Sequence, residues 1–178
     1  MNRMRSGAFT ILLLLFLSAC GDGVEQAVGT LAPCTSITTI EKSEKETITE
    51  CLDGGVGVDV TSIKGPAIIN VWGSWCQPCK DELPIFKEFY QELDPSIQLI
   101  GVDVEESSVK AGRSFALRQG ISWPNLFDRD GLTRAYFGMG VPVTWFIGSD
   151  GKVVAKHIGV FTSIDQLRTK TEKAFGKR

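Results

Sequence analysis

Apolar positions divide the C-terminal two thirds of the chain into strand-like and helix-like segments. Ala67–Trp72 is an almost continuous apolar run, which is typical of a strand covered on both faces. Residues 83–93 then carry apolar side chains at helical spacing. A second apolar run over residues 97–104 predicts another buried strand, parallel to the first because a helix connects them.

The remaining C-terminal part continues the alternation with shorter elements. The pattern predicts a helix that is capped within residues 105–108 and runs to Gly120, followed by an extended piece over 123–128 and a short helix over 131–137. Strands over 143–148 and 152–158 and a final helix capped by Ser163 complete the prediction. Asp150-Gly151 between the last two strands is a strong hairpin signal. This order of elements predicts an α/β sandwich with a mixed central sheet.

The segment before this pattern is polar and rich in Thr and Ile. Residues 34–51 have a charged centre at 41–46, which favours two short strands around a turn. Gly54-Gly55 is a turn signal, and residues 56–60 alternate as a further strand. We therefore expect an N-terminal β-hairpin extension over residues 34–56 of a domain that covers residues 34–178.

Length and charge narrow the class of protein. A chain of 178 residues is long enough for one domain with a substantial core. Its 19 basic and 21 acidic residues give a formal net charge of −2. Since no block of like charge is visible, we expect no nucleic-acid partner.

The first 20 residues have the pattern of a targeting segment. Arg3 and Arg5 precede an apolar run over residues 8–17, which is too short for a typical transmembrane helix. Leu-Ser-Ala-Cys20 resembles the lipobox of bacterial lipoproteins, which implies cleavage before Cys20 and lipidation of that residue. We expect a signal peptide over residues 1–19, a flexible tether over 20–33 and an extracytoplasmic domain anchored to the outer face of the membrane. The alternative is an ordinary secretory signal that leaves Cys20 as a free thiol.

Two thiols lie where the first buried strand meets the following helix. Cys76 is at the expected helix N-terminus, where unpaired N–H groups and the helix dipole stabilise a thiolate. It is therefore the candidate nucleophile, and Cys79, one turn along the same face, is the candidate resolving thiol. The alternative is half of a zinc site, but without a second Cys-x-x-Cys and with His157 as the single histidine we expect no metal.

Cys34 and Cys51 lie outside the segment that contains the cysteine pair. In an oxidising compartment, a mutual structural disulfide is the simplest assignment for them. The alternative is a relay of electrons to Cys76 and Cys79. The residues around them give no sign of a lowered thiol pKa, which disfavours a relay.

The motifs resemble those of a known family. Trp75-Cys76-Gln-Pro-Cys79-Lys after an apolar strand, with Pro84 beyond it and Gly-Val141-Pro142-Val-Thr far downstream, is similar to the thioredoxin superfamily. More narrowly, the chain from about residue 57 resembles the membrane-anchored TlpA/ResA-like thiol-disulfide oxidoreductases. This resemblance implies a thioredoxin-like α/β/α sandwich with an inserted strand-helix unit, which we place at residues 97–120.

The resemblance also implies roles for residues around the pair. A proline in a loop is usually preceded by a trans bond, whereas the family implies a cis Val141–Pro142 bond beside the disulfide. The backbone of Val141 would then pair with an extended substrate. Trp75 would shield the disulfide and contact substrate, although most such aromatic residues have only a packing role.

The resemblance further suggests an acid for proton transfer. Thioredoxin has a buried acid at the position of Asn70, and the ResA-like subgroup suggests Glu82 as its substitute. Glu82 lies one helical turn after Cys79, on the same face, where a carboxylate can take the proton from Cys79. The alternative is that Glu82 is a solvated helix residue.

Together these residues predict an extracytoplasmic thiol-disulfide oxidoreductase. The expected reaction is reduction of protein disulfides, with a membrane thiol as electron donor and without a cofactor. The family resemblance alone implies the haem-binding cysteines of apocytochromes c as a target. One alternative is an oxidase or isomerase with the opposite electron flow. A peroxidase would need a Thr-x-x-Cys pattern, whereas the chain has Gly73 there. A binding lipoprotein with purely structural cysteines is the remaining alternative.

Overall fold

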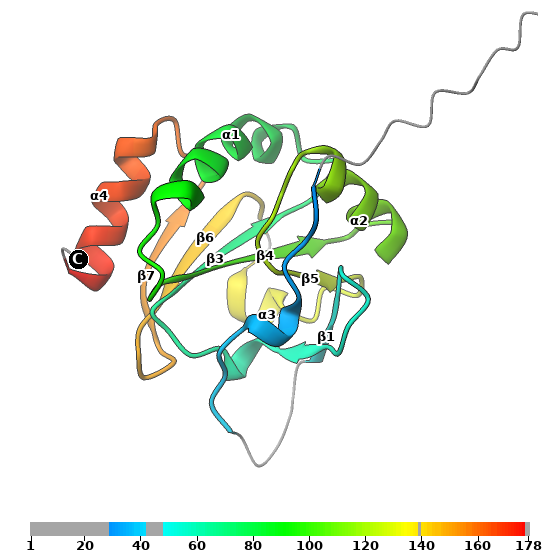
Figure 1. Cartoon of the computed structure of the whole chain (residues 1–178), viewed down its shortest axis with the longest axis horizontal. Coiled ribbons are helices and arrows are strands. Elements are labelled where there is room, and N and C mark those ends of the chain that lie inside the picture. The colour runs from blue at the N-terminus through cyan, green and yellow to red at the C-terminus, as the bar shows by residue number, and fades with distance from the viewer. Residues whose placement is uncertain (1–28, 42–47, 139, 177–178) are drawn as a thin grey trace, which may run out of the picture.

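The computed structural model describes residues 29–41, 48–138 and 140–176 (Figure 1). Seven strands form one mixed sheet in the order β2-β1-β5-β4-β3-β6-β7. The strands are β1 (Ile48–Cys51), β2 (Val58–Asp59), β3 (Ala67–Trp72), β4 (Gln98–Val104), β5 (Asn125–Asp128), β6 (Val143–Ile147) and β7 (Val153–Ile158). The helices are η1 (Cys34–Ser36), η2 (Val60–Ser62), α1 (Gln77–Glu92), α2 (Val109–Arg118), α3 (Arg134–Phe137) and α4 (Ile164–Phe175).

The centre of the sheet is β3, in which all six residues are buried. It pairs in parallel with β4, so that Trp72 lies opposite Asp103, and antiparallel with β6, so that Asn70 lies opposite Thr144. β4 also pairs in parallel with β5. The sequence prediction of a mixed central sheet around residues 67–72 is therefore confirmed.

Two apolar clusters cover the two faces of this sheet. Because successive strand residues point to opposite faces, Ile68 packs with residues of α1, α2 and α4, whereas Ile69 packs with Phe137 of α3 and with the Cys34 and Cys51 pair. Figure 1 shows α1, α2 and α4 along one side of the sheet. Burial on both faces explains why β3 has a continuous apolar sequence instead of an alternating one.

The expected inserted unit corresponds to β4 and α2. β4 is an inner strand, bonded to β3 on one side and to β5 on the other. The cap of α2 lies within the predicted segment 105–108, because Ser108 is the N-cap and accepts a hydrogen bond from the Ala111 N–H at 3.2 Å. Ser163 caps α4 in the same way, through the Gln166 N–H, as the sequence predicts.

The N-terminal hairpin prediction is wrong for the described residues. Its first half contains η1 and an isolated bridge between Thr39 and Ile63, and β1 pairs instead with β2 and with β5. A short strand can form its backbone hydrogen bonds with any free strand edge, and β1 forms them with β5. The further strand predicted over 56–60 is reduced to β2, because the Asp59 side chain accepts the Thr61 N–H and caps η2.

The packed part of the protein begins before residue 34. The Ala32 N–H donates to the Ser122 carbonyl at 3.1 Å, and Leu31 packs against the apolar cluster that contains residues of α1 and α2. Residues 29–33, expected in the tether, are therefore attached to the domain. The expected signal peptide and Cys20 lie outside the described residues. No helix within residues 29–41, 48–138 and 140–176 is long and apolar enough to cross a membrane.

Candidate active site

The Cys76–Cys79 pair lies at the junction of β3 and α1. Cys76 is the N-cap of α1, and its Sγ accepts the backbone N–H of Cys79 at 3.1 Å. The two residues are joined by a disulfide, with their Cα atoms 5.3 Å apart. Pro78 occupies the first turn of α1, where its missing N–H removes no helical hydrogen bond. The helix start therefore places one sulfur in a position that favours negative charge.

Both cysteines are largely covered in this disulfide form. Cys76 is 4% exposed and Cys79 is 6% exposed. The neighbouring Trp75, in contrast, is 53% exposed, and its Nε1 donates to the Val104 carbonyl at 3.1 Å. A partner protein must therefore pack closely against this surface to reach the sulfur atoms.

The loop between β3 and α1 is attached to the end of β4. The Ser74 N–H donates to Glu106 Oε1 at 2.8 Å, and the Trp75 indole contacts Val104 as described. Glu106 is buried and was not identified from the sequence. The sequence feature that could have pointed to Glu106 is its position just after the C-terminal end of a buried parallel strand, where functional residues commonly lie. Glu106 therefore helps to fix the segment that precedes Cys76.

Val141 and Pro142 lie just before β6, the strand adjacent to β3. Their peptide bond is cis, as the family resemblance implies. Pro142 immediately precedes β6, whose first residue Val143 pairs with Val71 of β3. Val141 and Trp75 line the same small cavity, of about 20 Å³. The fold therefore places these two predicted substrate contacts on one side of the β3–α1 junction.

Glu82 is buried, so the interpretation of a solvated helix residue is wrong. Its side chain is 1% exposed. One carboxylate oxygen accepts the Asn70 Nδ2 amide at 2.9 Å, and the other accepts the Phe161 N–H at 3.1 Å. Burial raises the pKa of Glu82 to about 7, although both hydrogen bonds oppose the shift. A carboxyl group with this pKa can accept or release a proton near neutral pH.

Asn70 connects the Glu82 carboxyl to the surroundings of Cys79. Besides its bond to Glu82, the Asn70 amide lies 3.4 Å from the hydroxyl of Thr144. Asn70 and Cys79 line one small cavity, of about 10 Å³, together with Trp72. Such a volume is about that of a single water-sized probe. The inner cysteine and the amide that binds the buried acid thus border one small cavity.

A second buried carboxyl, Asp103, was not identified from the sequence. It is fully buried on β4, and neither carboxyl oxygen has a hydrogen-bond partner among the described residues. Burial, together with the negative charge of Glu106, raises the pKa of Asp103 to about 9. The carboxyl packs so closely against Gly112 of α2 that a Cβ there would overlap with it. Asp103 is therefore neutral at physiological pH.

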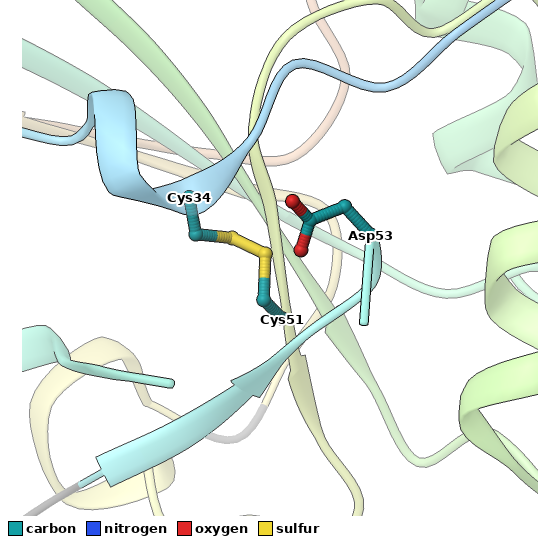
Figure 2. Close-up of side chains that lie close together, drawn as sticks. All are labelled: Cys34, Cys51 and Asp53. Carbon is teal, nitrogen blue, oxygen red and sulfur yellow. A yellow bond between two sulfur atoms is a disulfide. The ribbon is translucent and has the colours of Figure 1, made fainter. Parts of the chain in front are cut away.

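The second disulfide joins Cys34 of η1 to Cys51 at the end of β1 (Figure 2). Both residues are 2% exposed, and their Cα atoms are 6.1 Å apart. The Asp53 carboxylate points toward the sulfur atoms, and the three donor groups lie within 4.8 Å of one another. A metal ion binds a thiolate, and neither sulfur is a thiolate while the disulfide is intact. The predicted pairing is thus the one that the structure has.

A mixed sheet with a disulfide at the start of the helix after its central strand is the architecture of thioredoxin-like thiol-disulfide oxidoreductases, and this chain is one of them. It belongs to the AhpC/TSA family, whose sequence model matches residues 42–156. Thiol-disulfide oxidoreductase ResA of Bacillus anthracis is 27% identical over 164 residues, which cover 85% of this chain and 87% of that protein.

Two proteins of Bacillus subtilis extend the comparison. ResA of strain 168 is 32% identical over 111 residues, which cover 61% of this chain and 62% of that protein. The crystal structure of StoA superposes with a TM-score of 0.59 at 27% identity, and covers 70% of this chain and 95% of that one. The fold and the class of reaction predicted from the sequence are therefore confirmed.

Proposed function

We propose that the protein reduces disulfide bonds in other proteins through a dithiol-disulfide cycle of Cys76 and Cys79. The observation that supports this best is the N-cap position of Cys76, whose sulfur accepts the Cys79 N–H. A sulfur there is stabilised as a thiolate, and the thiolate is the attacking form. Gln77-Pro78 between the cysteines resembles the reducing members of the family more than the strong oxidants, which commonly have a histidine there.

The cycle begins with the reduced pair. The Cys76 thiolate attacks a target disulfide, one target sulfur leaves as a thiolate, and a mixed disulfide forms. The Cys79 thiol then loses its proton and attacks the Cys76 sulfur. This step releases the second target thiolate and forms the Cys76–Cys79 disulfide. Two electrons have passed from the cysteine pair to the target, and a membrane thiol donor returns them to the protein.

Glu82 is the proposed proton acceptor for Cys79. Its pKa of about 7 leaves a large fraction ionised at neutral pH, ready to accept a proton, and makes the protonated form equally accessible. Asn70 is an amide that donates to Glu82, so its role is to orient the acid. The shared cavity between Asn70 and Cys79 supports a short path between the two groups.

The proposed substrate site lies on the side of Trp75, Val141 and Pro142. An extended segment of the target pairs with the Val141 backbone, as in strand addition, and contacts the exposed indole of Trp75. Backbone pairing selects weakly among sequences. The proposed targets are therefore protein disulfides in general, including the haem-binding cysteines of apocytochromes c.

The proposed location is the outer face of the bacterial cell membrane. The Leu-Ser-Ala-Cys20 pattern after an apolar segment supports lipidation at Cys20, and acyl chains of this kind contribute about 0.8 kcal/mol for each buried methylene. A peroxidase reaction is not proposed, because its Thr-x-x-Cys pattern requires threonine at position 73, where the chain has glycine.

Trapping of the mixed disulfide tests the proposed cycle. In Cys79→Ser the resolving thiol is lost, so a covalent adduct between Cys76 and a disulfide-containing protein should accumulate and be visible by mass spectrometry. Cys76→Ser is the matched control and should give no adduct and no disulfide reduction. Full reductase activity in Cys76→Ser would contradict the proposal.

Replacement of the buried acid tests the proposed proton transfer. Glu82→Gln should slow the attack of Cys79 at pH 7 by at least about tenfold, because general base catalysis is lost, as measured by stopped-flow release of the target thiol. Asp81→Asn is the control, since Asp81 is exposed on the same helix. An unchanged resolution rate in Glu82→Gln would remove Glu82 from the mechanism.

A further inference from the structure

The one histidine of the chain, His157, lies outside the cysteine motif, and the sequence assigns it no role. It is half-buried on β7. Its ring stacks on the ring of Phe161, with centroids 3.9 Å apart and planes within 20° of each other. Its Nε2 lies 3.4 Å from the Val160 carbonyl in the same loop. His157 therefore contacts the segment between β7 and α4 in two places.

Phe161, the stacking partner, is the residue whose N–H binds Glu82. That N–H donates to Glu82 Oε2 at 3.1 Å, while the Phe161 side chain is 1% exposed. The Phe161 ring also contacts the ring of Phe86, edge-on with a centroid distance of 5.9 Å. Phe86 lies one turn after Glu82 on α1, so Phe161 is fixed between α1 and His157 of β7. This packing determines where its N–H points.

The other oxygen of Glu82 is connected to the same position of β7. Asn70 donates to Oε1 and lies 3.4 Å from the Thr144 hydroxyl. Thr144 on β6 is the register partner of His157. One hydrogen bond of the Glu82 carboxyl thus comes from Phe161, which stacks on His157. The other comes from Asn70, which lies next to Thr144, the strand partner of His157.

We propose that His157 is a positioning residue for Glu82, in that its flat ring fixes the Phe161 N–H on the carboxylate. This inference depends on the proposed role of Glu82 as the proton acceptor of Cys79. The hydrogen-bond partners of Glu82 are uncharged, and Cys79, one turn away on the same helix, does not titrate while its disulfide is intact. On the solvent side, His157 borders an open groove with Asp165, Lys170 and Lys173 of α4. The stack requires a planar ring at position 157, so another aromatic side chain at this position should position the Phe161 N–H as histidine does.

The titration of Glu82 itself provides the test. The carboxyl carbon of Glu82 is followed by carbon-13 NMR in the oxidised protein, with Glu82→Gln used to assign the signal. His157→Ala and His157→Leu remove the planar ring, and since the Phe161 hydrogen bond lowers the pKa of Glu82, the midpoint should rise in both by about 0.5 to 1 pH unit. His157→Phe keeps the stack and should keep the wild-type midpoint.

The controls separate this inference from general loss of stability and from the proposed function. Val154→Ala alters an exposed residue of the same strand and should leave the midpoint unchanged. A wild-type midpoint in His157→Leu, or an equal shift in His157→Phe, would overturn the positioning role whatever the activity of the protein. An unchanged resolution rate in Glu82→Gln would instead refute the proposed proton transfer, while the NMR midpoints would still decide the role of His157.

Discussion

Burial gives Glu82 and Asp103 different protonation states although both are carboxyls next to the active-site elements. Glu82 retains two hydrogen bonds, and its pKa is about 7. Neither oxygen of Asp103 has a hydrogen-bond partner among the residues that the structure describes, and its pKa is about 9. Desolvation disfavours the charged form, and hydrogen bonds to the charged form partly offset it. At neutral pH the first group exchanges protons and the second remains protonated.

Glu82 should make the protein less stable as pH rises from 4.5 to 7. Its pKa is higher in the folded protein, so the folded state retains a proton that the unfolded state has lost over this range. Its stabilising effect is complete below pH 4.5 and is lost as pH rises through about 7. Relative to Glu82→Gln, the wild type should lose on the order of 3 kcal/mol of unfolding free energy, measured by urea denaturation. A constant difference between the two proteins would contradict this.

Asp103 should produce a further loss of stability that begins near its ordinary pKa of 3.8 and continues until about pH 9. Its pKa of about 9 in the folded protein exceeds the value in the unfolded chain, so the free energy of unfolding again falls as pH rises. The stabilising effect of Asp103 is lost once the pH has risen through about 9. Between pH 7 and 9, where Glu82 no longer contributes, the wild type should lose on the order of 2 to 3 kcal/mol relative to Asp103→Asn. Parallel stability curves for the two proteins over this interval would show that Asp103 ionises normally.

The sequence identifies those site residues whose relationship is local. Cys76 and Cys79 follow from a helix start and a three-residue spacing, and Glu82 from the next turn together with the family resemblance. Asp103 and Phe161 were not found, because their contacts depend on distant segments: Phe161 is 79 positions from Glu82. An apolar pattern marks Phe161 as a core residue and contains no information on which carboxyl its N–H reaches.

At the scale of elements, β1 shows why the N-terminal prediction failed. Its composition correctly indicates a strand, but the partner of a short strand is set by which sheet edge is free. Here Glu50 and Cys51 pair with Phe127 and Leu126 of β5. The buried strand β3 and the caps of α2 and α4 were predictable because a continuous apolar run and a serine N-cap are local signals.

The η1–β1 disulfide should be protected from reductants by Asp53. Its carboxylate lies within 4.8 Å of both sulfurs, so it repels an approaching thiolate and disfavours the thiolates that reduction releases. Asp53→Asn keeps the oxygen that accepts the Gly55 N–H and should speed reduction of Cys34–Cys51 by dithiothreitol by about 3- to 10-fold at low salt. Glu50→Gln, exposed on β1, is the control. Equal rates in Asp53→Asn and wild type would refute the protective effect.

At the scale of the whole molecule, the part of the chain that the structure describes contains two disulfides in contrasting surroundings. Cys76–Cys79 lies at a helix N-terminus beside a titrating acid, whereas Cys34–Cys51 is covered and faces a carboxylate. The first arrangement stabilises a thiolate and the second opposes one. Reversible chemistry is thus expected at one pair while the other connects the N-terminal segment to the sheet.

The most direct test of the account is the reduction potential of the Cys76–Cys79 pair, measured with Cys34–Cys51 intact. Tryptophan fluorescence is followed against a dithiol buffer, because Trp72 and Trp75 lie close to the pair. A reductase of protein disulfides predicts a potential near that of thioredoxin, about −270 mV. A potential near about −120 mV would identify a donor of disulfides and contradict the proposed direction of electron flow.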